Sequence, residues 1–302
     1  MLTDNVFDEH GLMGYLEKKV GVDRVRGGDN LLIPVSTSED ANGGSYSGYD
    51  TFDTDPSDTV TNAVYGFAQY QQPIIALFSE VARNRSPEGA VDMWLNKVEV
   101  ANNSLRSKLN TDVFADGTGN SGKNILGLTI LVDSTGTVGN IARASNAYWA
   151  GQELASGGAL AIDTTVGMLQ LYNNCSTGSG DTSRPDIIVT TQAVDQSYEN
   201  LLSPDIRHTS QQTGDGTFSG LAFKGVPFMW DADATSGILY MLNASSFEMF
   251  IHPERDYTHT EIAKADNGTL NQDAWIGHIL VYIALVLAEG RRNGKLTGIS
   301  AS

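Results

Sequence analysis

The sequence has little positive charge, a single cysteine and no long apolar run. Its 19 Lys and Arg residues face 36 Asp and Glu residues, so the formal net charge is −17. This balance argues against a nucleic-acid-binding surface, because contact with phosphates requires clustered Lys and Arg. The lone cysteine, Cys175, excludes an internal disulfide framework and a cysteine-rich zinc site.

The apolar residues suit a globular protein rather than a membrane protein. The longest apolar stretch runs from Trp275 to Ala288 and has 14 residues, whereas a membrane-spanning helix needs about 20. Residues 1–20 are charged and lack an apolar centre, so we expect no secretory signal peptide. Hydrophobic residues make up 40% of the 302-residue chain, which is enough for the core of one large domain or two ordinary ones.

An acidic, polar segment separates two strand-like runs near the N-terminus. No Lys or Arg occurs between Arg26 and Arg83, and residues 31–35 and 62–77 flank a stretch rich in Ser, Thr, Gly and Asp. We predict a projecting hairpin, since a structureless loop of this length is unusual in a compact domain. Its exposed edges and aromatic residues need a cover, for which another copy of the chain is the natural candidate.

The proposed contacts between copies lie on this hairpin and on the basic clusters that would receive it. They are Glu39, Asp40, Tyr46, Tyr49, Asp50, Phe52, Asp53, Asp55 and Asp58 on the hairpin, and Arg83, Arg85, Arg291 and Arg292 in the basic clusters.

A long helix and a long strand are the strongest elements that the pattern predicts. Ser86, Pro87 and Glu88 are typical of a helix start, and the apolar residues that follow share one face over residues 87–110, about 36 Å of helix. Residues 276–288 are apolar on nearly both faces, which indicates a central strand. Helices and strands alternate without a regular period, so the predicted class is α+β. Further predicted strands are 125–132, 185–190, 221–224, 226–230, 237–242 and 247–252, and further predicted helices are 164–174 and 192–202.

One motif suggests an enzyme. Residues Gly117–Lys123 match the phosphate-binding pattern G-x-x-x-x-G-K. A phosphate-binding loop opens a helix, whereas this one follows the predicted long helix and precedes the predicted strand 125–132. We favour a flexible connector and keep a phosphate-binding enzyme as the remote alternative. The five histidines form no metal-binding pair and no nucleophile elbow is present, so we expect no catalytic, cofactor or metal site and no enzymatic activity.

The order of these elements resembles that of the major capsid proteins of tailed bacteriophages, which share the Hong Kong 97-type shell fold. The segments that carry the resemblance are 46–55 for the loop tip, 86–110 for the spine helix, 114–118 and 125–128 for the exit from that helix, 185–191 and 223–228 for the axial domain, and 285–299 for the carboxyl-terminal strands.

The resemblance implies a division of the chain into architectural parts. These are an N-terminal arm at 1–28, an extended loop at 29–77, a peripheral domain at 78–130 and 236–289 that contains the spine helix, and an axial domain at 131–235 and 290–302.

The resemblance also implies a structural role. Such a subunit assembles with itself into pentamers and hexamers of an icosahedral head, which encloses double-stranded DNA without sequence-specific binding. Scaffolding, portal and cement or decoration proteins are its candidate partners. The expected location is the virion, after assembly in the cytoplasm of a bacterial host. A bacterial nanocompartment (encapsulin-like) shell protein is the alternative with the same fold.

Overall fold

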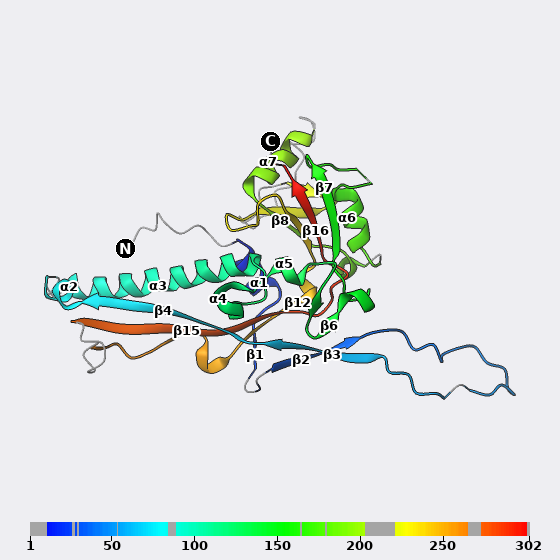
Figure 1. Ribbon diagram of the computed structural model, residues 1–302, viewed down its shortest axis with the longest axis horizontal. Helices are drawn as coiled ribbons and strands as arrows, with labels where there is room; N and C mark the ends of the chain where they lie inside the picture. The colour runs from blue at the N-terminus through cyan, green and yellow to red at the C-terminus, as the bar shows by residue number, and fades with distance from the viewer. Residues whose placement is uncertain are drawn as a thin grey trace.

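A long helix and two long strands lie side by side along the long axis of the molecule (Figure 1). The helix α3 spans Gly89–Phe114, and the strands β4 and β15 span Ala68–Leu77 and Ala274–Leu287. At 1.5 Å per residue, a helix of 26 residues is about 39 Å long. The computed structural model describes residues 11–25, 28, 30–52, 54–83, 89–163, 165–178, 180–202, 221–264 and 273–300.

β15 is the central strand of the first sheet, as its two apolar faces predict. It pairs with β4 on one side, and on the other side it pairs antiparallel with three shorter strands. The short helix α2 follows β4, and a short 3₁₀ helix, η4, precedes β13. The remaining elements of this part are β1 (Asp23–Arg24), which pairs with β12, β12 (Phe247–Ile251), β13 (Thr258–His259), β14 (Ala263–Lys264), α2 (Phe78–Arg83) and η4 (Pro253–Arg255).

The second sheet stands beside one end of the long helix (Figure 1). Its strand order is β7-β16-β11-β8-β10-β9, with β8 and β10 parallel and β11 antiparallel to β8. Every residue of β8 and β11 is buried, which places these two strands at the centre of the sheet. The strands are β7 (Gln152–Gly158), β8 (Ile187–Thr190), β9 (Ala222–Phe223), β10 (Val226–Trp230), β11 (Leu239–Leu242) and β16 (Gly294–Ile299), and the helices of this part are α6 (Met168–Cys175) and α7 (Gln192–Leu201).

A two-stranded ribbon projects from the body, as the acidic segment predicts (Figure 1). Its strands are β2 (Asn30–Ser36) and β3 (Val60–Gly66), which pair antiparallel along their full length. The turn β5–β6 packs beside the base of the ribbon, and short helices complete the fold. These elements are β5 (Thr137–Val138), β6 (Ile141–Ala142), α1 (Gly11–Lys19), α4 (Gly119–Gly122), α5 (Leu128–Leu131), η1 (Arg143–Ser145), η2 (Asp181–Ser183) and η3 (Ala244–Ser246).

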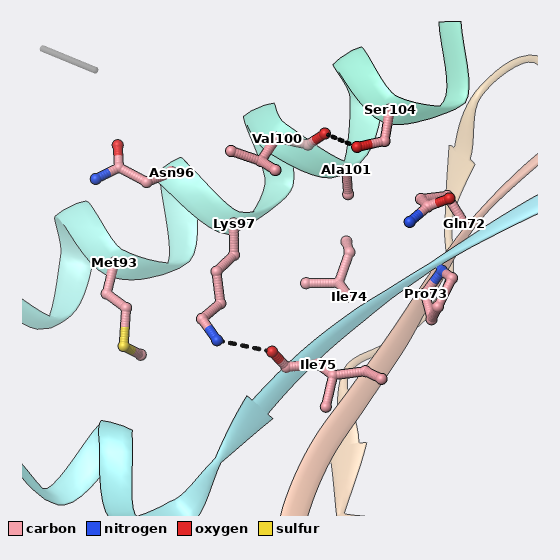
Figure 2. Close-up of a pocket in the computed structure, with 10 residues that line it drawn as sticks. All are labelled: Gln72, Pro73, Ile74, Ile75, Met93, Asn96, Lys97, Val100, Ala101 and Ser104. Atoms are coloured by element: carbon pink, nitrogen blue, oxygen red, sulfur yellow. Dashed lines mark hydrogen bonds between the residues drawn. The ribbon is translucent and has the colours of Figure 1, made fainter. Parts of the chain in front are cut away.

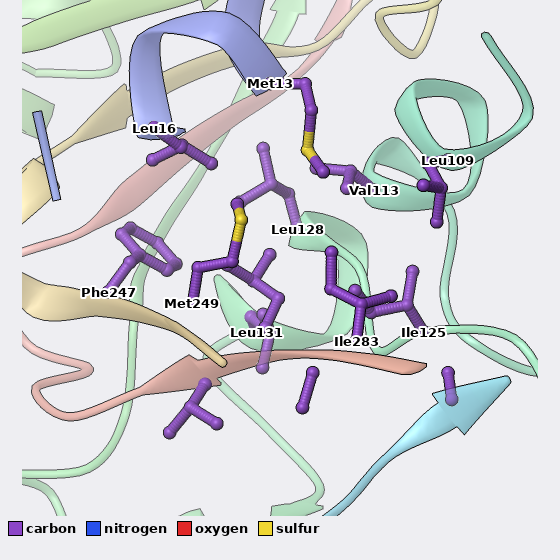
Figure 3. Packing of buried hydrophobic residues seen from close by; sticks show 14 of the residues in the cluster. Met13, Leu16, Leu109, Val113, Ile125, Leu128, Leu131, Phe247, Met249 and Ile283 are labelled. Carbon is purple, nitrogen blue, oxygen red and sulfur yellow. The ribbon is translucent and has the colours of Figure 1, made fainter. Parts of the chain in front are cut away.

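The largest core lies where α1, α3, α5 and the first sheet meet. Figure 3 shows Met13 of α1, Val113 of α3 and Leu128 of α5 packed together above Met249 and Ile283 of the sheet. A second core lies between the second sheet and the helices α6 and α7. One face of β8 and β11 contributes to each core, so these two strands join the two parts.

The predicted strand 125–132 is wrong, because this segment forms the short helix α5. Two features of the tertiary structure decide its shape. The guanidinium group of buried Arg143 donates hydrogen bonds to the carbonyls of Ile130 and Leu131 at 2.8 and 2.7 Å. At Gly127 the backbone passes so close to the end of α3 that a Cβ would clash with the carbonyl oxygens of Asp112, Val113 and Ala115.

The two predicted helices 87–110 and 164–174 are present with different bounds. The long helix is confirmed, and it continues four residues past 110. Its predicted start, at residues 86–88, lies outside the described residues. The predicted helix 164–174 begins later, at Met168. The side chain of Asp163 accepts hydrogen bonds from the N–H groups of Thr165 and Val166, which forms a separate turn ahead of the helix.

The predicted division of the chain differs from the observed elements in three places. Ala68–Leu77 fall in the predicted extended loop, but they form β4 in the first sheet. Leu239–Leu242 fall in the predicted peripheral domain, but they form β11 in the second sheet. Gly11–Lys19 fall in the predicted arm, but they form α1, which buries Leu12 and Leu16 in the main core.

We predict that Gly127→Ala lowers the free energy of unfolding by about 3 kcal/mol, because the added methyl group must displace the backbone of α3. The matched control is Gly14→Ala within α1, where nothing lies within 4 Å of the new Cβ. This control should raise the stability by up to about 1 kcal/mol through helix propensity. Denaturant unfolding of the unassembled subunit measures both changes, and equal stabilities for the two variants would contradict the packing argument.

Candidate assembly surfaces

The base of the ribbon is fastened to the body by buried contacts. The hydroxyl of Tyr65 donates a hydrogen bond to the carbonyl of Leu287 at 2.9 Å, and burial raises the pKa of this tyrosine, so it stays protonated. The N–H of Val64 donates to the carbonyl of Gly139 at 3.0 Å. Gly139 has a φ of +60°, and a Cβ there would lie 2.9 Å from the Ala63 Cβ. The ribbon and the β5–β6 turn therefore meet at a position where only glycine fits.

The tip of the ribbon carries exposed aromatic residues. Tyr46 and Phe52 pack edge to face with their ring centroids 5.0 Å apart, yet they remain 68% and 63% exposed. Tyr49 is fully exposed. Asp50 holds the turn locally, since its carboxylate accepts a hydrogen bond from the N–H of Ser47 at 2.7 Å. The tip therefore presents apolar area that no described residue of the body covers.

The acidic residues predicted as contacts surround this aromatic tip. Asp40 accepts a hydrogen bond from the N–H of Asn42, which stabilises a local turn. The described acidic residues Glu39, Asp40, Asp50, Asp55 and Asp58 are all exposed, and Asp53 lies outside the described residues.

The structure does not bring the acidic tip and the basic residues together within one chain. Arg83 is exposed at the end of α2, which lies at the opposite end of the long axis from the ribbon (Figure 1). Arg291 is exposed beside the second sheet, and Arg292 forms an ion pair with Glu289 at 2.7 Å. Arg85 lies outside the described residues. A contact between the tip and Arg83 or Arg291 would therefore join different copies of the chain.

The loop that matches a phosphate-binding motif has a different geometry. Within it, α4 contains Asn120 and Ser121 in the left-handed conformation, and no long helix follows. The N–H groups of Gly122 and Lys123 donate to carbonyls of the same turn, Thr118 and Gly119. A phosphate cradle needs such N–H groups to point at the ligand, so this arrangement does not provide one.

Other sites of chemistry are not apparent in the described part of the chain. Cys175 is fully buried, and burial raises the pKa of its thiol, which disfavours a reactive thiolate. Among the described residues, no three His, Cys, Asp or Glu side chains are arranged to hold a metal ion. No described helix has both the length and the apolar composition needed to cross a bilayer.

A groove of about 710 Å³ opens between α3 and β4 (Figure 2). Ile74 and Ala101 line its floor, and Lys97 reaches across it from α3 to the carbonyl of Ile75 at 2.8 Å. No pattern in the sequence indicates Lys97 and its partner Glu80, because the two residues are 17 positions apart in different elements. The two side chains come into contact only because α3 packs against β4.

No model of a protein family matches this sequence, and no curated protein is similar to it. Solved structures are similar over nearly the whole chain. A chain of the cyanophage A-1(L) capsid asymmetric unit is 14% identical with a TM-score of 0.72, covering 99% of this chain and 95% of that one. A chain from Mycobacterium phage Bobi is 13% identical with a TM-score of 0.62, covering 100% and 94%. The SrpI encapsulin of Synechococcus elongatus PCC 7942 is 8% identical with a TM-score of 0.62, covering 100% and 91%.

The chain, with its long helix on long strands, its projecting ribbon and its second sheet, has the fold of phage capsid chains. More specifically, the chain has the Hong Kong 97-type fold of phage capsid proteins. The fold expected from the order of sequence elements is thereby confirmed.

We predict that Tyr65→Phe weakens the base of the ribbon. The variant lacks the hydroxyl that donates to the Leu287 carbonyl, so this buried carbonyl loses its hydrogen bond. The free energy of unfolding should fall by about 1 kcal/mol. Tyr49→Phe removes the same hydroxyl at the exposed tip and should change the stability by less than about 0.5 kcal/mol. Denaturant unfolding of both variants provides the comparison, and equal effects would contradict the anchoring role.

Proposed function

We propose that the chain is the structural major capsid protein of a phage head, which assembles with itself into pentamers and hexamers around double-stranded DNA. The observation that carries this proposal is the ribbon, whose exposed aromatic tip stands far from the body that anchors it. The similarity in fold to the cyanophage capsid chain over 99% of the sequence supports it. The role is structural, and catalysis plays no part in it.

Contacts between unlike surfaces explain how such a ribbon would build a closed shell. The tip of one copy would lie on a different surface of the next copy, and such head-to-tail contacts close into rings when the rotation between copies allows it. The acidic tip and the exposed Arg83 and Arg291 form a complementary pair of surfaces for this purpose. Charge complementarity of this kind selects the register of a contact more than it adds affinity.

The net charge of −17 fits a container for DNA. A wall of the same sign as the phosphate backbone would repel DNA at long range, so the genome could move during packaging. Scaffolding, portal and decoration proteins remain candidate partners, and one solved structure with a similar fold is a procapsid of satellite phage P4 that includes a size determination protein. The expected location is the virion, after assembly in the host cytoplasm.

A nanocompartment shell is the second candidate, because the SrpI encapsulin shares the fold. The two functions differ in what the particle contains. Particles purified from the native source should yield double-stranded DNA, whereas a cargo enzyme without DNA would favour the nanocompartment. The higher TM-score of the cyanophage capsid chain favours the phage head.

We predict that a shortened ribbon abolishes shell assembly without unfolding the subunit. Replacing Glu39–Asp58 by Asn-Gly leaves the three residues Ser38-Asn-Gly between Thr37 and Thr59, which are already joined by a backbone hydrogen bond of 2.8 Å. A three-residue hairpin loop that ends in glycine is a common short connection, so the replacement is sterically reasonable. Circular dichroism and thermal unfolding should match the wild-type subunit, and electron microscopy should find no closed particles.

The matched control is Lys123→Ala, which changes one exposed residue outside the ribbon. It should assemble like the wild-type chain. Normal closed shells from the shortened ribbon would refute the role assigned to the tip, and saturable nucleotide binding that Lys123→Ala abolishes would support the phosphate-binding alternative instead.

A further inference from the structure

An Asn-Gly pair lies on one arm of the ribbon, at Asn42 and Gly43. Gly43 and the next residue, Gly44, are both exposed, and nothing lies within 4 Å of a Cβ placed at either of them. The N–H of Gly43 donates to no group of the described residues. Because glycine has no Cβ and adopts a wide range of φ and ψ, this backbone nitrogen can approach the side chain of Asn42 without a steric barrier.

The side chain of Asn42 joins the two arms of the ribbon. Its Nδ2 donates to the carbonyl of Asp55, on the other arm, at 2.5 Å. This contact requires an N–H donor, which the amide supplies and an ionised carboxylate does not. A carboxylate at this position would instead place a negative charge beside the carbonyl oxygen of Asp55. Loss of the amide nitrogen would therefore break this contact between the arms.

A second Asn-Gly pair, Asn293 and Gly294, has the opposite surroundings. Asn293 is fully buried, its Oδ1 accepts from the N–H of Asn243 at 2.8 Å, and its Nδ2 donates to the carbonyl of Glu289 at 2.8 Å. Gly294 is the first residue of β16, which lies between β7 and β11. The amide is thus held at both ends, and any movement of the backbone nitrogen toward it requires local opening of the second sheet. The third Asn-Gly pair, at 267–268, lies outside the described residues.

We propose that Asn42 is a site of spontaneous deamidation, which changes both the charge and the internal contacts of the ribbon tip. The backbone nitrogen of Gly43 attacks Cγ of Asn42, and the new C–N bond closes a five-membered succinimide ring. The bond from Cγ to Nδ2 breaks, and the proton from Gly43 passes through water to the departing nitrogen, which leaves as ammonia. Water then opens the ring and yields aspartate or isoaspartate.

The product adds one negative charge to a ribbon that already carries exposed carboxylates, and it removes the donor to Asp55. Isoaspartate also lengthens the main chain by one carbon atom at this position. The reaction needs only the chain and water, so it does not depend on the proposed shell function.

Peptide mapping by mass spectrometry tests the proposal on the full chain, kept unassembled in dilute, mildly alkaline solution. The peptide that contains Asn42 should gain the mass difference between an amide and a carboxyl group. Its rate should be at least about tenfold higher than that of the peptide that contains Asn293, since the buried pair reacts only through local opening. An isoaspartyl methyltransferase, used as a probe for isoaspartate, should label the Asn42 peptide.

Two variants separate the Asn-Gly chemistry from the general exposure of the tip. Gly43→Ala should slow deamidation at Asn42 at least about tenfold, because the methyl group hinders the attack and narrows the backbone conformations. Gly44→Ala adds the same methyl group in equally open space but keeps the Asn-Gly pair, so it should react like the wild-type chain. Asn42→Asp carries the charge of the product, and chymotrypsin should cleave its aromatic tip at least about twofold faster than that of fresh wild-type chain.

Three results would overturn the proposal. Equal deamidation rates at Asn42 and Asn293 would show that the open surroundings of the ribbon do not matter. Equal rates in Gly43→Ala and Gly44→Ala would exclude attack by the Gly43 nitrogen. Unchanged cleavage of Asn42→Asp would contradict the loss of contact between the arms.

Discussion

The pairing of β4 with β15 is the constraint on which the rest of the structure depends. It runs through ten consecutive positions, from Leu77 opposite Ala274 to Ala68 opposite Ile283. Only Phe67 separates β4 from β3, so the ribbon and the first sheet are formed by one extended stretch of chain. Because the sheet fixes the direction of β4 and α3 packs along it, the direction in which the ribbon leaves the body is fixed as well.

Apolar residues gather in the body, whereas exposed charged residues gather on the ribbon. The two cores meet through β8 and β11, whose residues are all buried, so the body behaves as one packed unit. Exposed carboxylates and aromatic rings gather at the tip of the ribbon, remote from both cores. The body thus supplies stability, and the ribbon carries exposed apolar area that the described residues of the same chain leave uncovered. This is the arrangement that the proposed assembly through the ribbon requires.

Periodic patterns in the sequence predicted the elements that local chemistry determines. The stripe of apolar residues identified α3, the doubly apolar run identified β15, and the absence of Lys and Arg marked the ribbon. The apolar run around Gly127 resembles a strand in the sequence. Its helical shape depends on contacts with Arg143 and Ala115, which the local pattern does not reveal. The Lys97–Glu80 pair was likewise hidden, since it requires the packing of α3 on β4. The ribbon's acidic residues could be located from the sequence. The surface that we propose receives them would belong to another copy, so no pattern along the chain specifies it.

Imaging of the full chain, expressed alone and together with virion partners, tests the central claim most directly. The account predicts closed particles in which the ribbon tip of each copy, near Tyr46 and Phe52, lies against the body of a neighbour. A chain that remains a monomer at high concentration under both conditions would contradict it.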